Sequence, residues 1–189
     1  LLRRELPPPV ESLEAWWRQH RRLAASSASP IDLALLGGLC ADRLGYAFAS
    51  GYQAAAASLF GASDGMTALC ATEHEGAHPR AIKTTLIATE AGGHVMSGSK
   101  TFVTLGSAAQ RLLVVASRGH DAQGRNALVV VAIDADRQGV TIAPGAELPF
   151  TPEIPHASLT LERVAVAADE VLAGDGYSDY LKPFRTVED

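Results

Sequence analysis

The spacing of hydrophobic residues changes once along the chain, near residue 65. Up to that point apolar residues recur every three to four positions, which is typical of amphipathic helices. From Met66 onward β-branched residues become frequent and the period falls towards two, which is typical of strands. The pattern therefore predicts helices first and a β-domain afterwards, with the boundary near residues 61–66, where the sequence GASDG breaks the helical pattern.

Capping residues place the helices of the first part. Ser12 is the predicted N-cap of a helix within residues 10–26, and Ser29 is the predicted N-cap of a second helix. We expect the glycine pair at 37–38 to weaken or end that second helix, because glycine disfavours helix interiors. The helical pattern then resumes over residues 39–60.

Short strand-like segments follow one another after residue 65, with turn residues between them and no helical stretch. Strands at this spacing favour an antiparallel barrel or sandwich. The chain is therefore predicted to be α+β, with a shortened N-terminal helical domain at 1–65, a β-domain at 66–175 and the start of a linker or C-terminal helical domain at 176–189. The predicted strands are 66–73, 81–90, 94–104, 111–117, 127–134, 139–143 and 157–166.

The composition is that of an ordinary globular protein, with 47% hydrophobic and 20% charged residues in 189. A net charge of −5 provides no basic field for a phosphate backbone, which argues against nucleic acid as a partner. No apolar run is long enough to predict a membrane span. The two cysteines, Cys40 and Cys70, are too few for a disulfide framework, so a cytoplasmic location is expected.

Residues 74–78 read His-Glu-Gly-Ala-His and match the zinc-peptidase pattern H-E-x-x-H. That pattern works on a helix, which puts both histidines on one face and lets the glutamate act as a base on zinc-bound water. Here Gly76 lies between the histidines, and Pro79 pushes His78 away from helical dihedrals. Two loop histidines in a polar turn are therefore the favoured interpretation, and a zinc site is the alternative.

Three segments resemble the acyl-CoA dehydrogenase family and occur in the family's order. The first, in residues 70–84, is CATE followed by a glycine-containing loop and IKT. The second, SGSKTFVTLG in residues 97–106, is similar to the family's segment G-x-K-x-[WF]-[IV]-T-x-G. The third, in residues 156–176, looks like the segment that closes the family's β-domain. Together they are more specific than any one alone, and the resemblance covers roughly residues 40–177.

The resemblance implies FAD as the cofactor, and the residues suit a flavin. A flavin ring needs a flat apolar wall and a few hydrogen bonds to its polar edge. The resemblance implies that Ala71 and Thr72 meet the pyrimidine end of the ring. It also implies that Phe102 forms the wall, while Val103 and Thr104 face the ring near its reactive nitrogen. Without the resemblance, each of these is read as a partly buried strand residue.

The loop that follows Glu73 departs from the family, whose members usually read T-E-x-x-x-G-S-D. The Ser-Asp pair, which meets the flavin diphosphate and the acyl thioester in the family, is absent, and Gly76 alone keeps the turn glycine. His78 or Arg80 could supply the phosphate contact instead. The alternative is that the loop no longer binds its usual partner.

The family's C-terminal helical domain has no counterpart in the sequence. The chain begins with Leu and ends on RTVED, so we expect a fragment of a longer protein that is inactive on its own. In the family that domain carries the catalytic carboxylate, part of the FAD site and the oligomer interface. No catalytic residue is therefore assigned, because the spacing makes neither Glu73 nor Glu75 a base.

The helical part is shorter than the family's, so the resemblance does not carry over the size of the acyl group. Its aromatic residues could line an acyl pocket, but aromatic residues at helical spacing are more often part of a core. Those residues are Tyr46, Phe48, Tyr52 and Phe60.

The resemblance thus predicts a portion of an FAD-dependent oxidoreductase that dehydrogenates an acyl thioester between its α and β carbons. The implied partners are an acyl-CoA or related thioester, an electron-transfer flavoprotein or similar acceptor, and further copies of the chain. Two alternatives stay open. One is a flavin-dependent monooxygenase of the same fold, and the other is a non-catalytic scaffold that binds an acyl carrier or partner without flavin.

Overall fold

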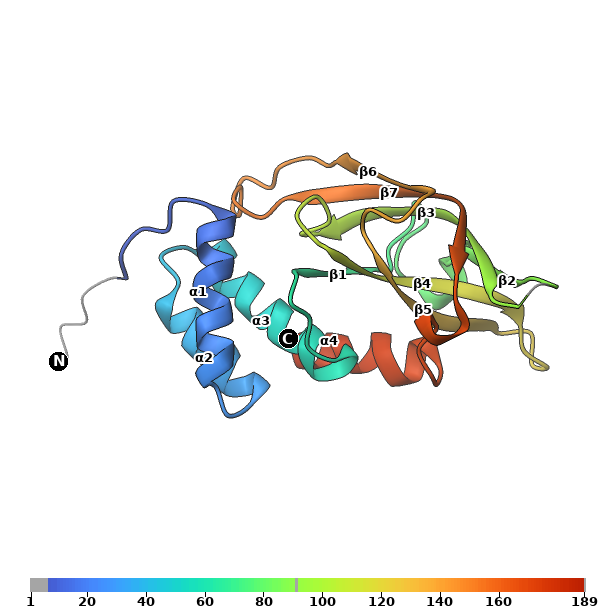
Figure 1. Ribbon diagram of the computed structural model, residues 1–189, viewed down its shortest axis with the longest axis horizontal. Coiled ribbons are helices and arrows are strands. Elements are labelled where there is room, and N and C mark those ends of the chain that lie inside the picture. The colour runs from blue at the N-terminus through green and yellow to red at the C-terminus, as the bar shows by residue number, and fades with distance from the viewer. Residues whose placement is uncertain (1–6, 91, 189) are drawn as a thin grey trace. The chain divides into compact units, whose positions relative to one another are not determined.

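The computed structural model describes residues 7–90 and 92–188, which fall into two compact units (Figure 1). The first unit comprises the described residues up to Ala62 together with Glu147–Ile154. The second comprises Ser63–Ala146 and Pro155–Val187. The segment at 147–154 therefore belongs with the helices, although it lies between two strands in the sequence.

The helices of the first unit begin where their capping residues predict. Ser12 Oγ accepts a hydrogen bond from the Ala15 amide, and Ser29 Oγ accepts one from the Asp32 amide, each at 3.2 Å. Such a cap stabilises a helix by about 1 kcal/mol. The helices are α1 (Leu13–Ser26), α2 (Pro30–Cys40) and α3 (Leu44–Phe60). No helix among the described residues is long and apolar enough to cross a membrane.

Helix α2 continues through residues 37–38, so the expectation that it weakens or ends there is wrong. The reason is close packing against α3. A Cβ atom at Gly37 would lie 2.4 Å from the side chain of Ser50, so only glycine fits at this crossing. Glycine costs a helix interior about 1 kcal/mol, and here that cost accompanies a tight helix–helix contact.

The aromatic residues of the first unit are mostly core, as the sequence favours. Tyr46, Tyr52 and Phe60 are buried, and the Tyr46 ring stacks on Trp16 with 5.6 Å between ring centroids. Phe48 is more exposed, at 38%. The described helical unit therefore uses most of these rings to hold itself together.

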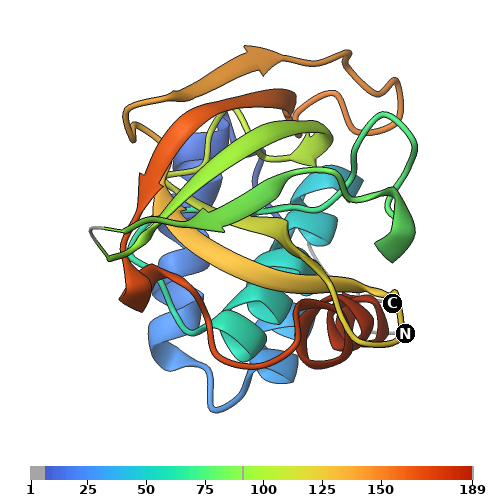
Figure 2. The same cartoon turned by 90° about the vertical axis from the view of Figure 1, so that its right-hand side faces the viewer.

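A seven-stranded sheet forms the second unit and curls into a half-barrel (Figure 2). The α+β fold class is confirmed. Strand β4 lies between β5 on one side and β1 and β2 on the other, and the sheet continues from β2 through β3 and β7 to β6. The strands are β1 (Thr67–Cys70), β2 (Thr85–Ala88), β3 (His94–Thr104), β4 (Arg111–His120), β5 (Asn126–Asp134), β6 (Val140–Pro144) and β7 (His156–Val166).

The sheet is mixed and not wholly antiparallel as predicted, because β1 and β2 both run parallel to β4. Strand β1 pairs with the start of β4, from Arg111 to Val114, and β2 pairs further along at Ser117. The chain leaves this edge of β4 after Cys70 and returns to it in the same direction at Thr85. Residues 71–84 are therefore a loop that divides one strand path in two, and the predicted strands on either side of it are too long.

The interior of the curled sheet is made by alternate residues of its long strands. Met96 of β3, Leu112 and Val114 of β4, Val131 of β5 and Leu159 of β7 are all buried in one apolar cluster. This cluster fixes the strands from which the loop 71–84 and the end of β3 project.

Three short helical elements follow β7: the 3-10 helix η2 (Ala168–Glu170), the π-helix η3 (Gly176–Leu181) and α4 (Lys182–Glu188). A Cβ atom at Gly176 would lie 2.8 Å from the backbone at Leu128 and Val129. The start of η3 therefore lies directly against β5.

Candidate functional site

Strand β3 carries a bulge at the predicted flavin segment, and Phe102 lies in it. The register with β7 shifts between Lys100 and Val103, and Phe102 has a φ of 55°. A left-handed backbone costs a residue other than glycine roughly 1–2 kcal/mol. The Phe102 ring is 59% exposed and contacts the His156 ring with 4.7 Å between centroids. A strained backbone that presents an aromatic ring to solvent is typical of a ligand-contacting residue.

The two segments predicted to meet the flavin are bonded to each other. The Thr101 amide donates to the Thr72 carbonyl oxygen at 2.8 Å, and Lys100 Nζ donates to the Ala71 carbonyl oxygen at 3.4 Å. Both carbonyl groups of the first segment are thus engaged within the protein. What Ala71 and Thr72 can still offer a ligand are their amides and the Thr72 hydroxyl.

A buried ion pair lies behind this contact. Lys100 Nζ is 2.7 Å from Glu73 Oε1, and the two side chains are 0% and 7% exposed. Burial, the largest influence on the Glu73 carboxyl, would raise its pKa, but hydrogen bonds from Lys100 and Thr84 hold that pKa below its ordinary value. Burial lowers the pKa of the Lys100 ammonium, and Glu73 opposes that shift. Each partner therefore favours the charged form of the other, against the effect of burial.

Glu73 also closes the two ends of the loop 71–84. Its Oε1 accepts from the Thr84 amide at 3.0 Å and from Thr84 Oγ1 at 2.7 Å, and its Oε2 accepts from the Lys83 amide at 2.8 Å. With Lys100 included, the carboxylate is saturated by donors. Glu73 therefore acts as a structural clamp and is not available as a base. The T-E and G-x-K segments can both be found in the sequence. Nothing in their spacing, however, indicates that Glu73 and Lys100 are in contact.

The H-E-x-x-H match lies in a turn and not in a helix. The Glu73 amide donates to the Gly76 carbonyl oxygen at 3.1 Å, and the Gly76 amide donates back to the Glu73 carbonyl oxygen at 2.8 Å. Gly76 has a φ of 107°, and His74 and Glu75 are exposed. The helix that the zinc motif requires is not formed here. Within residues 7–90 and 92–188, no group of three or more His, Cys, Asp or Glu side chains is placed to hold a metal ion.

The remaining predicted contacts lie at the end of β3. Thr104 is the last residue of that strand and is half-buried, whereas Val103 is 1% exposed and points into the core. Only the backbone of Val103 can therefore meet a ligand. The hydroxyls of Thr72 and Thr104 make no hydrogen bond to any other residue in the described part of the chain. An exposed flat ring and two uncommitted hydroxyls on neighbouring segments are the kinds of group that suit the apolar face and polar edge of a flavin ring.

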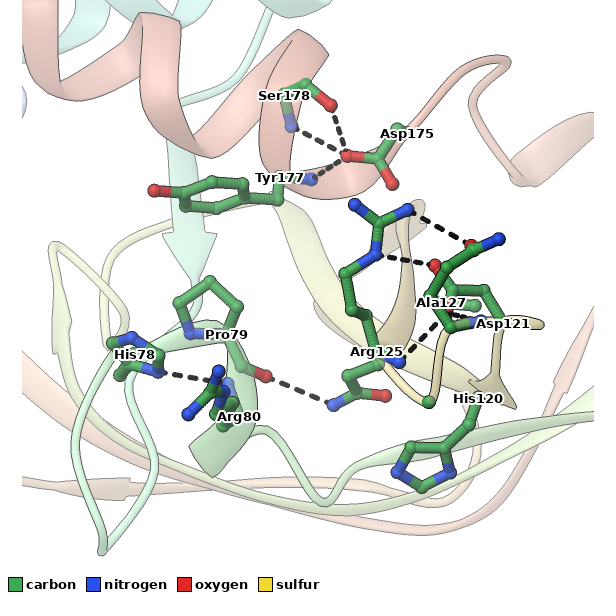
Figure 3. Close-up of a pocket in the computed structure, with 13 residues that line it drawn as sticks. His78, Pro79, Arg80, His120, Asp121, Arg125, Ala127, Asp175, Tyr177 and Ser178 are labelled. Atoms are coloured by element: carbon green, nitrogen blue, oxygen red, sulfur yellow. Dashed lines mark hydrogen bonds and ion pairs between the residues drawn. The ribbon is translucent and has the colours of Figure 1, made fainter.

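His78 lies apart from these residues, in the exposed part of the loop. It lines a pocket of about 740 Å³ together with the β4–β5 hairpin and the start of η3 (Figure 3). The sequence interpretation named His78 and Arg80 here but missed His120 and Arg125, which line the same pocket. Residues 118–126 are marked in the sequence only as a loop, and no pattern there shows which loop they face.

A protein-family model for "Acyl-CoA dehydrogenase, middle domain" matches residues 68–164 of the chain, from β1 to β7. No curated protein matches the sequence. The match therefore covers the strands and the loop that carry the candidate site.

Solved structures share this fold. Butyryl-CoA dehydrogenase from Megasphaera elsdenii has a TM-score of 0.73 at 16% identity, over 94% of this chain and 56% of that chain. The prolyl acyl carrier protein oxidase AnaB has a TM-score of 0.70 at 20% identity, over 92% and 53%. An acyl-CoA dehydrogenase from Bacillus anthracis complexed with FAD has a TM-score of 0.71 at 16% identity, over 92% and 35%. At these identities the likeness establishes the fold, and the chain spans about half or less of the length of these proteins.

Proposed function

The chain belongs to the acyl-CoA dehydrogenase family, and from that premise we propose that it is part of an FAD-dependent oxidoreductase acting on an acyl thioester. The observation that carries the proposal is the bulge in β3. It presents the exposed Phe102 ring on the segment that ends at Thr104, and the Thr101 amide joins this segment to the Thr72 carbonyl oxygen. A strand used only for packing has no need of a strained, exposed aromatic residue.

Each residue at this edge has a distinct proposed role towards FAD. Phe102 forms the flat wall against the ring, and the amides of Ala71 and Thr72 with the Thr72 hydroxyl donate to its pyrimidine end. The Val103 backbone and the Thr104 hydroxyl face the ring near its reactive nitrogen. When bound, FAD supplies the hydride-accepting chemistry that the side chains of this chain lack.

The buried pair Glu73–Lys100 is proposed to position the flavin edge without touching it. Lys100 lies two residues before Phe102 and bonds the Ala71 carbonyl oxygen, while Glu73 directly follows Thr72. Together they fix the spacing between the wall and the hydrogen-bonding segment. A site held within about half an ångström is what productive orientation of a cofactor requires.

The proposed substrate is a thioester carried by coenzyme A or by an acyl carrier protein. Both kinds of carrier occur in the names of the structurally similar proteins. We assign no catalytic base to this chain, because Glu73 is saturated by donors and Glu75 forms an ion pair with Lys83. Electrons would pass from the reduced flavin to an electron-transfer flavoprotein or a similar acceptor, and the working enzyme is proposed to be a homo-oligomer.

Replacing Thr104 tests the flavin edge. Thr104→Val in the full-length protein removes one hydrogen bond to the ring, so FAD affinity should fall about fivefold or the flavin reduction potential should shift. Thr141→Val is the matched control, because Thr141 is exposed on β6, away from the site. If both variants bind and reduce FAD like the parent protein, the assignment of residues 101–104 is wrong.

The reaction itself is tested by anaerobic mixing of the FAD-loaded full-length protein with acyl thioesters. Dehydrogenation predicts bleaching of the flavin band and an α,β-unsaturated product, with reoxidation by an electron-transfer acceptor. Oxygen insertion into the product in air would instead favour the monooxygenase. A flavin that no acyl thioester bleaches would contradict the proposed substrate class.

A further inference from the structure

The end of β3 has an unusual backbone at two positions close together. Leu105 has a φ of 60°, similar to the 55° of Phe102, and it is fully buried. Residues other than glycine rarely adopt this left-handed conformation, and they keep it only where the surrounding structure holds them in it. The segment 102–105 therefore depends on its neighbours for the conformation that exposes the Phe102 ring.

The start of β7, at Pro155–Ala157, supplies those neighbours. The Leu105 amide donates to the Pro155 carbonyl oxygen at 2.8 Å. Directly beside this bond, Thr104 pairs with His156 in the register of β3 with β7. The residue after Phe102 and Val103 thus lies opposite His156, and the bulge that carries Phe102 lies next to it.

The backbone of His156 is itself fixed from two directions. Its carbonyl oxygen accepts from the Gly145 amide at 2.8 Å and from Ser107 Oγ at 3.4 Å. A Cβ atom at Gly145 would lie 3.2 Å from the same carbonyl group, so the chain that leaves β6 approaches it closely. The position from which the His156 imidazole projects is therefore well determined.

The imidazole of His156 supports the exposed Phe102 ring. His156 is 6% exposed and Phe102 is 59% exposed. The two ring centroids are 4.7 Å apart and the ring planes are inclined at 44°, which is within the range of attractive aromatic contacts. The buried ring thus holds the exposed ring from the protein side, and much of the Phe102 ring stays accessible to a ligand.

We propose that His156 is a positioning residue for the flavin, because its imidazole holds the Phe102 ring in the orientation in which that ring forms the wall against FAD. This inference rests on the proposed function. The imidazole acts through Phe102 and does not touch FAD. A ring that turned freely would have to be ordered when FAD binds, and the cost of that ordering would lower the affinity. The contact with His156 meets this cost before FAD arrives.

Titration of the flavin-free full-length protein with FAD tests the positioning role. We expect His156→Ala to weaken FAD binding about fivefold, and His156→Phe, which keeps a flat ring, to restore the affinity to within about twofold of the parent. His20→Ala is the matched control, because His20 is also buried and its ring stacks on Trp16 at 5.2 Å in the first unit. It should lower the melting temperature and leave FAD affinity unchanged.

A double-mutant cycle separates positioning from a general loss of stability. In Phe102→Gly the wall is absent, so adding His156→Ala should cause no further loss of FAD affinity. A loss that persists undiminished in the Phe102→Gly background would overturn the proposal. Equal FAD affinities of the parent protein and His156→Ala would overturn it as well, and so would equal losses in His156→Ala and His20→Ala.

A measurement without FAD keeps this inference distinguishable from the proposed function. A fluorinated phenylalanine at position 102 of the flavin-free full-length protein gives a fluorine NMR resonance that reports the surroundings of the ring. We expect His156→Ala to move this resonance towards its position in the urea-unfolded protein, and His156→Phe to keep it displaced. A resonance that His156→Ala leaves unchanged would contradict the contact. A parent protein that takes up no FAD would overturn the proposed function and with it the flavin role of His156, whereas the resonance would still report the contact between the two rings.

Discussion

The loop that separates β1 from β2 has a base and a tip that differ in solvent exposure and in hydrogen bonding. The base is Ala71–Glu73 with Lys83–Thr84, and the tip is His74–Arg80. In the base, Glu73 is 7% exposed and takes hydrogen bonds from three residues. In the tip, Glu75 has an ion pair with Lys83 in which both side chains are more than half exposed. Glu73 and Thr84 of the base form a buried network with Lys100. The tip is held by the turn between Glu73 and Gly76 and by the Asn126 side chain, which donates to the Pro79 carbonyl oxygen.

This difference explains which part of the loop matches the family pattern. The base keeps the T-E and I-K-T segments, while the tip reads His-Glu-Gly-Ala-His-Pro where Gly-Ser-Asp is usual. A buried charge without its partner is expensive, so residues of the base depend on one another. Residues of the tip face solvent and can change singly. The base therefore keeps the segment proposed to meet the flavin, whereas the tip can depart from the family pattern.

Among the variants that compare the base with the tip, replacement of the buried Glu73 carboxylate should change the free energy of unfolding most. Glu73→Gln leaves the Lys100 ammonium buried and uncompensated, so the free energy of unfolding should fall by about 3–5 kcal/mol. Glu75→Gln, the matched change in the tip, should alter it by less than about 1 kcal/mol. Urea denaturation followed by circular dichroism measures both.

A double variant sharpens the result. Glu73→Gln with Lys100→Met removes the uncompensated charge, so it should recover part of the lost stability. Similar losses for Glu73→Gln and Glu75→Gln would show that base and tip do not differ as described.

Replacing Phe102 should have a smaller effect, and one that separates function from stability. Phe102→Gly relieves a left-handed backbone worth roughly 1–2 kcal/mol and loses a ring contact with His156 worth about 0.5–1.5 kcal/mol, so stability should change little. FAD affinity of the full-length protein should fall about tenfold, because the wall against the ring is lost. Phe150→Gly removes another exposed ring and should leave FAD affinity unchanged. An unchanged affinity in Phe102→Gly would mean that this residue is not the wall.

At acidic pH the Glu73–Lys100 pair should cause a modest change in the slope of the free energy of unfolding against pH. The pKa of Glu73 lies below its ordinary value of 4.5, so its contribution to stability is complete above that pH and is lost as the pH falls through the lowered pKa. The parent chain should therefore lose stability more steeply below about pH 4.5 than Glu73→Gln does. Denaturation curves between pH 3 and 7 compare the slopes. Parallel slopes would show that Glu73 has no lowered pKa in the folded chain.

Local signals in the sequence predict the elements of this fold well. Ser12 and Ser29 mark helix starts because a cap bonds an amide only three residues away. Strand β3 is found at its predicted bounds, 94–104, because alternation and the preceding glycine pair act within the same short stretch. The change of period near residue 65 likewise predicts helices followed by strands.

Contacts between residues that are far apart in the sequence cannot be predicted from such local signals. From the sequence, Gly37 is expected to break the helix. In the structure a Cβ atom at this position would lie 2.4 Å from the side chain of Ser50, so the glycine permits close packing. The parallel pairing of β1 and β2 with β4 depends on where the chain returns after the loop 71–84. The Glu73–Lys100 pair and the pocket that His78 and His120 both line likewise depend on the finished sheet, which no local pattern encodes.

The most direct test of the central claim, that residues 71–72 and 102–104 form a flavin-binding edge, is titration of the flavin-free full-length protein with FAD. Absorbance and ring fluorescence report the occupancy. We expect a yellow protein that binds one FAD per chain, with the affinity reduced in Phe102→Gly and Thr104→Val. A full-length protein that stays colourless and takes up no FAD would contradict it.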